Sequence, residues 1–170
     1  TCNSCHPDTK EDNTDNRSHA IHRNKVACQV CHSQTSKSCF SCHVGTDKKG
    51  LPYFKCKETR MVFKIGLNTA KSEKRPYDYV VVRHIPISTD TYSSWGVTDL
   101  PNYDSQPTWK YATPHNIQRW TARTDTSGGG SCNAKCHNNA NSALTTYLRQ
   151  ADVTAIDPNE LNANQNVIIP

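Results

Sequence analysis

Four short motifs in this chain each place two cysteines and a histidine within five or six residues. Three of them have the pattern C-x-x-C-H, and the fourth, CNAKCH, has one further residue between its cysteines. This is the spacing of a c-type haem attachment site, in which two thiols add to the haem vinyl groups and the adjoining histidine binds the iron. The motifs therefore predict four covalently held haems. The predicted attachment cysteines are Cys2, Cys5, Cys28, Cys31, Cys39, Cys42, Cys132 and Cys136, and the predicted proximal histidines are His6, His32, His43 and His137.

Two other uses of paired cysteines compete with haem. The pairs Cys28/Cys31 and Cys39/Cys42 have the spacing of a four-thiolate zinc site, and a disulfide framework would also use paired cysteines. Neither requires a histidine directly after the second cysteine, yet all four motifs have one, so haem is favoured. Cys56 remains outside the motifs and is interpreted as a buried thiol or as one half of an intermolecular disulfide.

The remaining histidines match the number of haems. The chain has eight histidines, and four of them follow the motif cysteines. Its single methionine, Met61, lies in the apolar run MVFKIGL and is interpreted as a packing residue. We therefore predict two histidine ligands for each iron, which leaves no open coordination position and suits electron transfer rather than catalysis. The candidate distal ligands are His19, His22, His84 and His115.

The polar composition suggests a chain built around large apolar cofactors. Hydrophobic residues make up 34% of the chain, with the cysteines included. Such a chain offsets its ordering entropy poorly by side-chain burial alone, so we expect the haems to be the core and the polypeptide their wrapping. The formal charge of +5 falls to about +1 if each oxidised haem contributes about −1 through ionised propionates. Without a basic block, this charge does not favour nucleic-acid binding.

The cellular location follows from the haem prediction. No stretch of the sequence approaches the roughly 20 apolar residues of a membrane-spanning helix. Haem attachment to C-x-x-C-H motifs takes place outside the cytoplasm, so we expect an exported protein whose signal peptide has been removed. The expected location is extracellular or at the cell surface, with the periplasm as the alternative.

Residues 1–43 contain three of the four motifs. Only six residues separate His32 from Cys39, so the second and third haems are expected to be close neighbours. His19 and His22 are three residues apart, and on a helical turn they would share one face and could serve two adjacent haems.

The rest of the chain predicts a few short elements. Residues 44–131 form a segment rich in strands and loops, in which 60–68 and 77–87 predict a β-hairpin. Short helices are predicted after Pro114, at 142–150, and at 158–165, the last with Asp157 as its N-cap. The apolar ending VIIP is expected to close the domain's own core, with packing on a neighbour as the alternative.

Three segments resemble known multihaem c-type cytochromes. They are KVACQVCH with the CFSCH motif that follows it, PTWKYATPHNIQRW before the last motif, and the ending DPNELNANQNVIIP. The likeness is to extracellular tetrahaem cytochromes that polymerise into filaments, the OmcE-type cytochrome nanowires. It implies a homopolymer with bis-histidine haems stacked in alternating parallel and T-shaped pairs that continue between subunits. It also implies extracellular electron acceptors or redox partners, and one distal histidine, such as His19 or His22, that binds a haem of the next subunit. The spacing of CNAKCH departs from the regular motif, which puts the geometry of that haem in doubt.

The expected fold is a single multihaem cytochrome c domain over residues 1–170. It is predicted to be largely irregular coil with short helices and a small β-hairpin, wrapped around four stacked haems. The leading hypothesis is an electron conduit in an extracellular filament. A monomeric periplasmic tetrahaem shuttle, the electron-transfer module of an oxyanion reductase with a five-coordinate haem, and a haem-free zinc protein remain as alternatives.

Overall fold

The computed structural model describes most of the chain. The described ranges are residues 2–9, 17–22, 25–34, 41–46, 49–50, 52–57, 63–85, 93–97, 105–114, 116–137 and 146–170, with only the backbone described for 41–46 and 52–57. The helical elements are α1 (Cys2–Cys5), η1 (Pro7–Thr9), α2 (Arg17–His22), α3 (Cys28–His32), η3 (Ser93–Trp95), α4 (Cys132–Cys136), α5 (Gln150–Thr154), η6 (Pro158–Glu160) and α6 (Leu161–Asn164).

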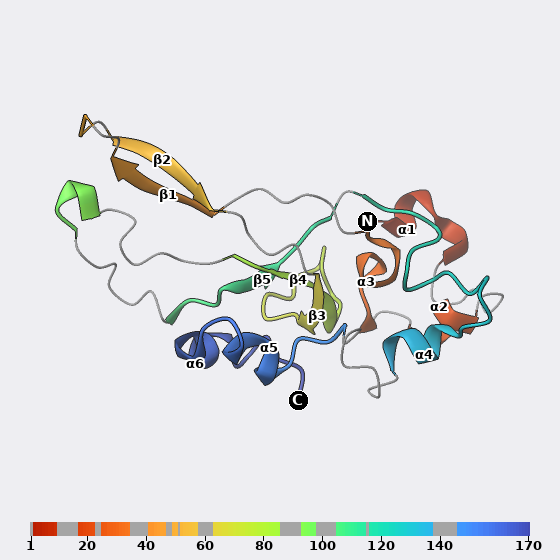
Figure 1. Ribbon diagram of the computed structural model, residues 1–170. Coiled ribbons are helices and arrows are strands. Elements are labelled where there is room, and N and C mark those ends of the chain that lie inside the picture. The colour runs from red at the N-terminus through yellow and green to blue at the C-terminus, as the bar shows by residue number, and fades with distance from the viewer. Residues whose placement is uncertain are drawn as a thin grey trace.

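Two antiparallel sheets accompany these short helices. The first pairs β1 (Ser41–Thr46) with β2 (Pro52–Lys57), and Figure 1 shows it apart from the second sheet. The second sheet has the order β3-β4-β5 and consists of β3 (Lys64–Leu67), β4 (Tyr79–His84) and β5 (Trp109–Tyr111). In Figure 1, α1 to α4 lie together on one side of this sheet, and α5 and α6 lie on the other.

The predicted β-hairpin is present as β3 and β4. Its strands run antiparallel from the Lys64–Val82 pair to the Leu67–Tyr79 pair. The three consecutive valines of β4 favour an extended backbone, because branching at Cβ restricts the side-chain rotamers in a helix. The other edge of β4 pairs with β5, which the sequence did not predict as a strand.

The C-terminal part of the chain covers the remaining edge of β3. Leu148 N donates to Ile65 O at 2.8 Å, and Leu67 N donates to Val167 O at 2.9 Å. The approach at Gly66 is so close that an added Cβ would lie 3.0 Å from Val167 O. The apolar ending therefore closes the domain's own core, as predicted.

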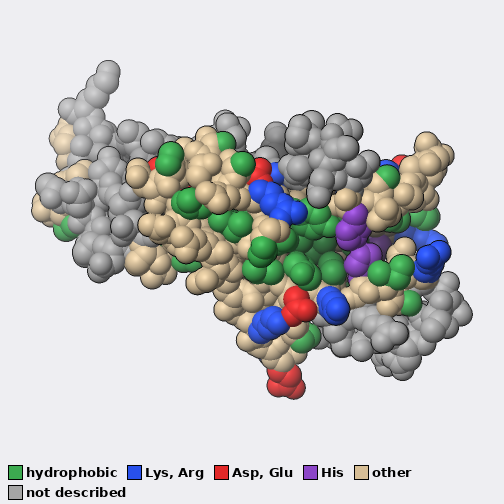
Figure 2. All heavy atoms as spheres, turned by 90° about the horizontal axis from the view of Figure 1, so that it is seen from below, with side chains coloured by type: hydrophobic (Ala, Val, Ile, Leu, Met, Phe, Trp, Pro, Cys, Tyr) green, Lys and Arg blue, Asp and Glu red, His purple; other side chains and the backbone are tan. Residues whose placement is uncertain are grey.

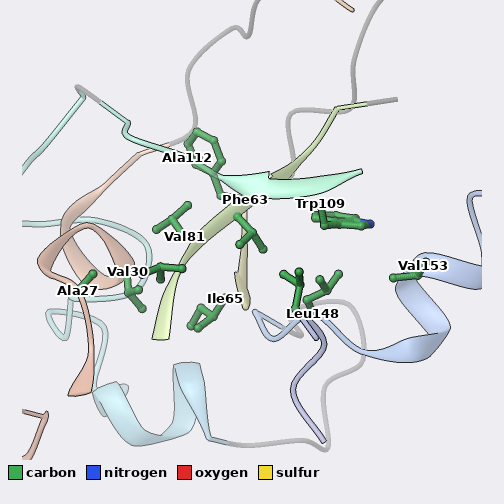
Figure 3. Packing of buried hydrophobic residues seen from close by; sticks show 12 residues of the cluster. Ala27, Val30, Phe63, Ile65, Val81, Trp109, Ala112, Leu148 and Val153 are labelled. Atoms are coloured by element: carbon green, nitrogen blue, oxygen red, sulfur yellow. The ribbon is translucent and has the colours of Figure 1, made fainter. Parts of the chain in front are cut away.

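Figure 3 shows a cluster of buried hydrophobic side chains that the polypeptide forms by itself. Its members come from α3 and the residue before it, from the β3-β4-β5 sheet and its flanks, and from the C-terminal region. They are Ala27, Val30, Phe63, Ile65, Val80, Val81, Val82, Trp109, Ala112, Leu148, Val153 and Val167. The expectation that haems alone form the core is therefore wrong for the sheet region, because this region has a side-chain core.

Two of the predicted helices are wrong where the structure describes them. Within the predicted helix 142–150, Tyr147 instead forms a parallel bridge with Ile65, and α5 begins only at Gln150. After Pro114, Ile117 forms an antiparallel bridge with Ser33. In both places, pairing with a distant segment satisfies backbone groups that a helix would satisfy locally.

The third predicted helix is present in shortened form. Residues 158–164 are helical as η6 and α6, with Pro158 at the first helical position. Asp157 is the N-cap, and its Oδ1 accepts a hydrogen bond from Asn159 N at 2.9 Å. The helical turn predicted for His19 and His22 is also present, as α2.

Candidate functional site

Three of the four cysteine–histidine motifs fold as short helices. The first motif forms α1, the second forms α3, and the two cysteines of the fourth begin and end α4. Residues three or four apart on a helix lie on the same face. The helical backbone therefore places the two cysteines of each motif side by side, which is the arrangement that attachment to one porphyrin edge requires.

The third motif differs. Cys39 lies outside the described residues, and Cys42 and His43 lie on β1, where the backbone register puts them opposite Cys56 and Lys55. The extended backbone of β1 contrasts with the helical turn of the other three motifs. Cys56, the cysteine outside the motifs, thus lies in the strand that pairs with the third motif.

A segment far along the chain holds the C-terminal end of α3 in place. Gln118 N donates to His32 O at 2.9 Å, and Thr121 Oγ1 donates to Cys31 O at 2.6 Å. Arg123 Nη1 donates to Val30 O at 2.6 Å. These donors satisfy carbonyl groups that have no partner within so short a helix. Sequence analysis missed Thr121 and Arg123, because nothing in the local pattern indicates which distant helix they cap.

The ring nitrogens of three histidines have defined partners. Nδ1 of His22 lies 2.8 Å from Ser18 O, and Nδ1 of His32 lies 3.1 Å from Gln118 O. A carbonyl oxygen can only accept, so Nδ1 carries the hydrogen in both residues, and the neutral ring keeps its lone pair on Nε2. Metal-binding histidines have this arrangement, with the second ring nitrogen bonded to a backbone carbonyl. Nδ1 of His137 lies 3.2 Å from the Tyr147 hydroxyl, which could accept in the same way.

The structure brings two candidate distal histidines to two proximal ones. The ring centroids of His19 and His32 are 6.1 Å apart with an interplanar angle of 61°, and those of His22 and His137 are 6.1 Å apart at 9°. A histidine nitrogen binds a metal at about 2.0–2.1 Å and lies about 1.1 Å from its ring centre, so two imidazoles across one iron have centroids about 6.3 Å apart. Both centroid distances match this spacing; the first pair is arranged edge to face, and the second has nearly parallel, stacked ring planes.

The surroundings of these rings are partly apolar. Figure 2 shows histidine side chains next to one another at a recess lined by hydrophobic side chains. Burial lowers the pKa of His19, and the neighbouring His32 and His22 lower it further. Burial and nearby positive charge therefore favour the neutral imidazole, which is the form that binds a metal.

The cysteine thiols of three motifs lie within electrostatic reach of one another. Burial raises the pKa of the Cys28 thiol, which also interacts with Cys2 and accepts a hydrogen bond from Tyr77. Burial raises the pKa of Cys31 to about 11, and the neighbouring Cys136 adds to the effect. The second motif is thus within electrostatic reach of the first through Cys28 and of the fourth through Cys31.

His84 has a different environment from the paired histidines. It is buried, and its Nε2 lies 3.0 Å from Glu160 Oε2, which also accepts a hydrogen bond from Thr108 Oγ1 at 2.6 Å. A carboxylate only accepts, so Nε2 carries the hydrogen and has no lone pair for iron in this arrangement. Glu160, in the C-terminal helical region, thus binds a histidine from the sheet.

Three further histidines of the predicted site have no described pairing with another histidine. His115 lies outside the described residues, and for His43 only the backbone is described. His6 is exposed directly after α1. The structure therefore pairs two of the four candidate distal ligands, His19 and His22, with motif histidines.

The described residues contain neither a zinc site nor a disulfide of the kind that the competing hypotheses require. No three side chains among the described histidines, cysteines, aspartates and glutamates converge so as to hold a metal ion. The six cysteines whose side chains are described are free thiols. The four-thiolate site predicted as an alternative includes Cys39 and Cys42, whose side chains lie outside that description.

No protein-family model, curated protein or solved structure matches this chain. Among the helices in the described ranges, none has the length and apolar character needed to cross a membrane. The functional argument therefore depends on the chain's own residues.

Proposed function

We propose that this protein is a tetrahaem c-type cytochrome that transfers electrons. The observation that carries the proposal is the pairing of two motif histidines with two further histidines at the spacing of imidazoles across one iron. Haem c, when bound, supplies the redox chemistry. The chain's own residues would attach it through paired thiols and hold its iron from both sides.

The histidine pairs favour electron transfer over catalysis. An iron with two imidazole ligands has no open position for a substrate, whereas catalytic haems keep one axial position free. The backbone partners of Nδ1 in His22 and His32 would orient both rings and make them stronger ligands.

The finer proposal is a subunit of an extracellular filament that conducts electrons over long distances. The cysteines of the first motif and His6 are exposed, so a haem bound there would present one face to a neighbouring molecule. Large apolar side chains are exposed as well, including Ile21, Ile117 and Trp120 at 62%, 50% and 58%.

Three measurements on the purified full-length protein test the proposal. Intact mass and a pyridine haemochrome assay should give four covalent haems per chain. The resting spectrum should be low-spin, and negative-stain microscopy of native preparations should show filaments. A protein without haem would refute the function, and a protein with four haems that stays dispersed would refute only the filament.

A further inference from the structure

We infer that α2 supplies the distal ligands of two haems, His19 for the haem of the second motif and His22 for the haem of the fourth, and that these two haems are immediate neighbours. This inference rests on the proposed function, because it assigns ligands to haems that the proposed function requires. It adds the order of two haems in space, which differs from their order in the sequence.

The geometry of α2 limits the distance between the two irons. His19 and His22 are three residues apart on the helix, which puts their Cβ atoms about 5–6 Å apart. An imidazole with a metal–nitrogen bond of about 2.0 Å places the metal about 6 Å from its Cβ. The irons are therefore at most about 18 Å apart. Because each macrocycle extends several ångströms from its iron, the haem edges lie much closer than that.

The attachment thiols support the same neighbourhood independently of the histidines. Cys31 of the second motif interacts electrostatically with both Cys132 and Cys136 of the fourth. The Arg123 guanidinium lies near Cys31 and Cys136 and donates to the backbone of α3. Thiols and axial histidines thus bring the same two motifs together.

This arrangement differs from the order that the sequence suggests. The short distance between His32 and Cys39 in the sequence predicts that the second haem adjoins the third. In Figure 1, the β1 strand of the third motif instead lies apart from α3, whereas α4 lies near α2. The second haem therefore has the fourth as its partner through α2, and the first as its partner through Cys2 and Cys28.

The assignment can be tested in the full-length holoprotein by changing the absorption spectrum of one haem at a time, which we call tagging that haem. Cys28→Ala and Cys132→Ala each leave one haem attached through a single thiol, and its unreacted vinyl group shifts its absorption band. His19→Met and His22→Met are then combined with each tag in a two-by-two set. A methionine ligand raises the reduction potential of its haem, so a redox titration followed at the shifted band reports which haem has received it.

We expect His19→Met to raise the potential of the haem tagged by Cys28→Ala and to leave the haem tagged by Cys132→Ala unchanged. His22→Met should give the reverse, and each mismatched combination is the control for the matched one. Shifts in the mismatched combinations, or no shift in any of the four, would overturn the assignment.

If a single-thiol variant loses its haem, the spin state of the other three haems gives the same information. His19→Gly should then create a high-spin haem only where the haem of the second motif is present. Four haems in the parent protein keep the proposed function intact whichever result is obtained.

Discussion

The His84–Glu160 contact gives the sharpest test of how the histidines are divided between iron and structure. His84 Nε2 lies 3.0 Å from Glu160 Oε2 in a buried setting, with 4% of His84 and 8% of Glu160 exposed. Replacing His84 removes one of the two hydrogen bonds that Glu160 Oε2 accepts, and the bond from Thr108 Oγ1 remains. Loss of a hydrogen-bond partner costs a buried polar group about 1–3 kcal/mol. We therefore expect His84→Leu to lower the free energy of unfolding by about 1–3 kcal/mol while the number of low-spin haems stays unchanged.

A double-mutant cycle separates this contact from general packing. Glu160→Leu removes the same contact from the other side and also leaves Thr108 Oγ1 without its acceptor. If the pair acts as a unit, His84→Leu/Glu160→Leu should be more stable than the sum of the single effects predicts, by about 1–3 kcal/mol. The assay is denaturant unfolding of holoproteins with matched haem content, followed by far-ultraviolet circular dichroism.

The absorption spectrum of His84→Leu shows whether the stability change measured in the double-mutant cycle comes from a structural contact or from a lost iron ligand. A new high-spin haem in His84→Leu, together with additive stability effects, would refute the reasoning and return His84 to the ligand set as the sequence predicts. An unchanged low-spin spectrum would leave seven histidines for four irons, so that one haem would have a second ligand other than histidine.

Two further substitutions test the scaffold around the candidate site. Gly66→Ala should destabilise the protein by about 1–3 kcal/mol through overpacking, because the new Cβ would lie 3.0 Å from Val167 O. Gly128→Ala is the control, because its new Cβ would meet nothing within 4 Å. Equal denaturation midpoints for the two variants would contradict the close approach of Val167 to Gly66. Arg123→Met should cost about 2–4 kcal/mol, because it removes donors 2.6 and 3.2 Å from two backbone carbonyl oxygens. The same change at exposed Arg119, whose guanidinium lies over the Trp120 ring, should cost under about 1 kcal/mol. Equal losses of stability in the two variants would show that α3 does not depend on Arg123.

The sequence predicts those parts of the structure that local patterns determine. Two runs rich in Val, Ile, Phe and Tyr on either side of a charged link predict the β3–β4 hairpin, and histidines three apart predict the shared face of α2. Asp157 before a proline predicts the helical start of η6. In each case the signal and the element occupy the same few residues.

The sequence fails where a residue's partner is distant. Tyr147 and Ile117 lie in runs predicted as helical, yet Tyr147 pairs with Ile65 of β3 and Ile117 pairs with Ser33, directly after the second motif. Propensity differences of a few tenths of a kcal/mol are easily outweighed by such backbone pairing. The histidine pairs belong to the same class, because residue counting gives the number of ligands but not which motif each one reaches.

The β3–β4 hairpin explains how the second and fourth motifs come to be neighbours although a long stretch of chain separates them. Ala27 N, directly before the second motif, donates to Tyr79 O on β4 at 3.0 Å. Leu148 N, shortly after the fourth motif, donates to Ile65 O on β3 at 2.8 Å. Because β3 and β4 are adjacent strands with a side-chain core, each motif is anchored to one strand of the same unit. The polypeptide core that the composition failed to predict is therefore the element that would set the spacing of the two haems.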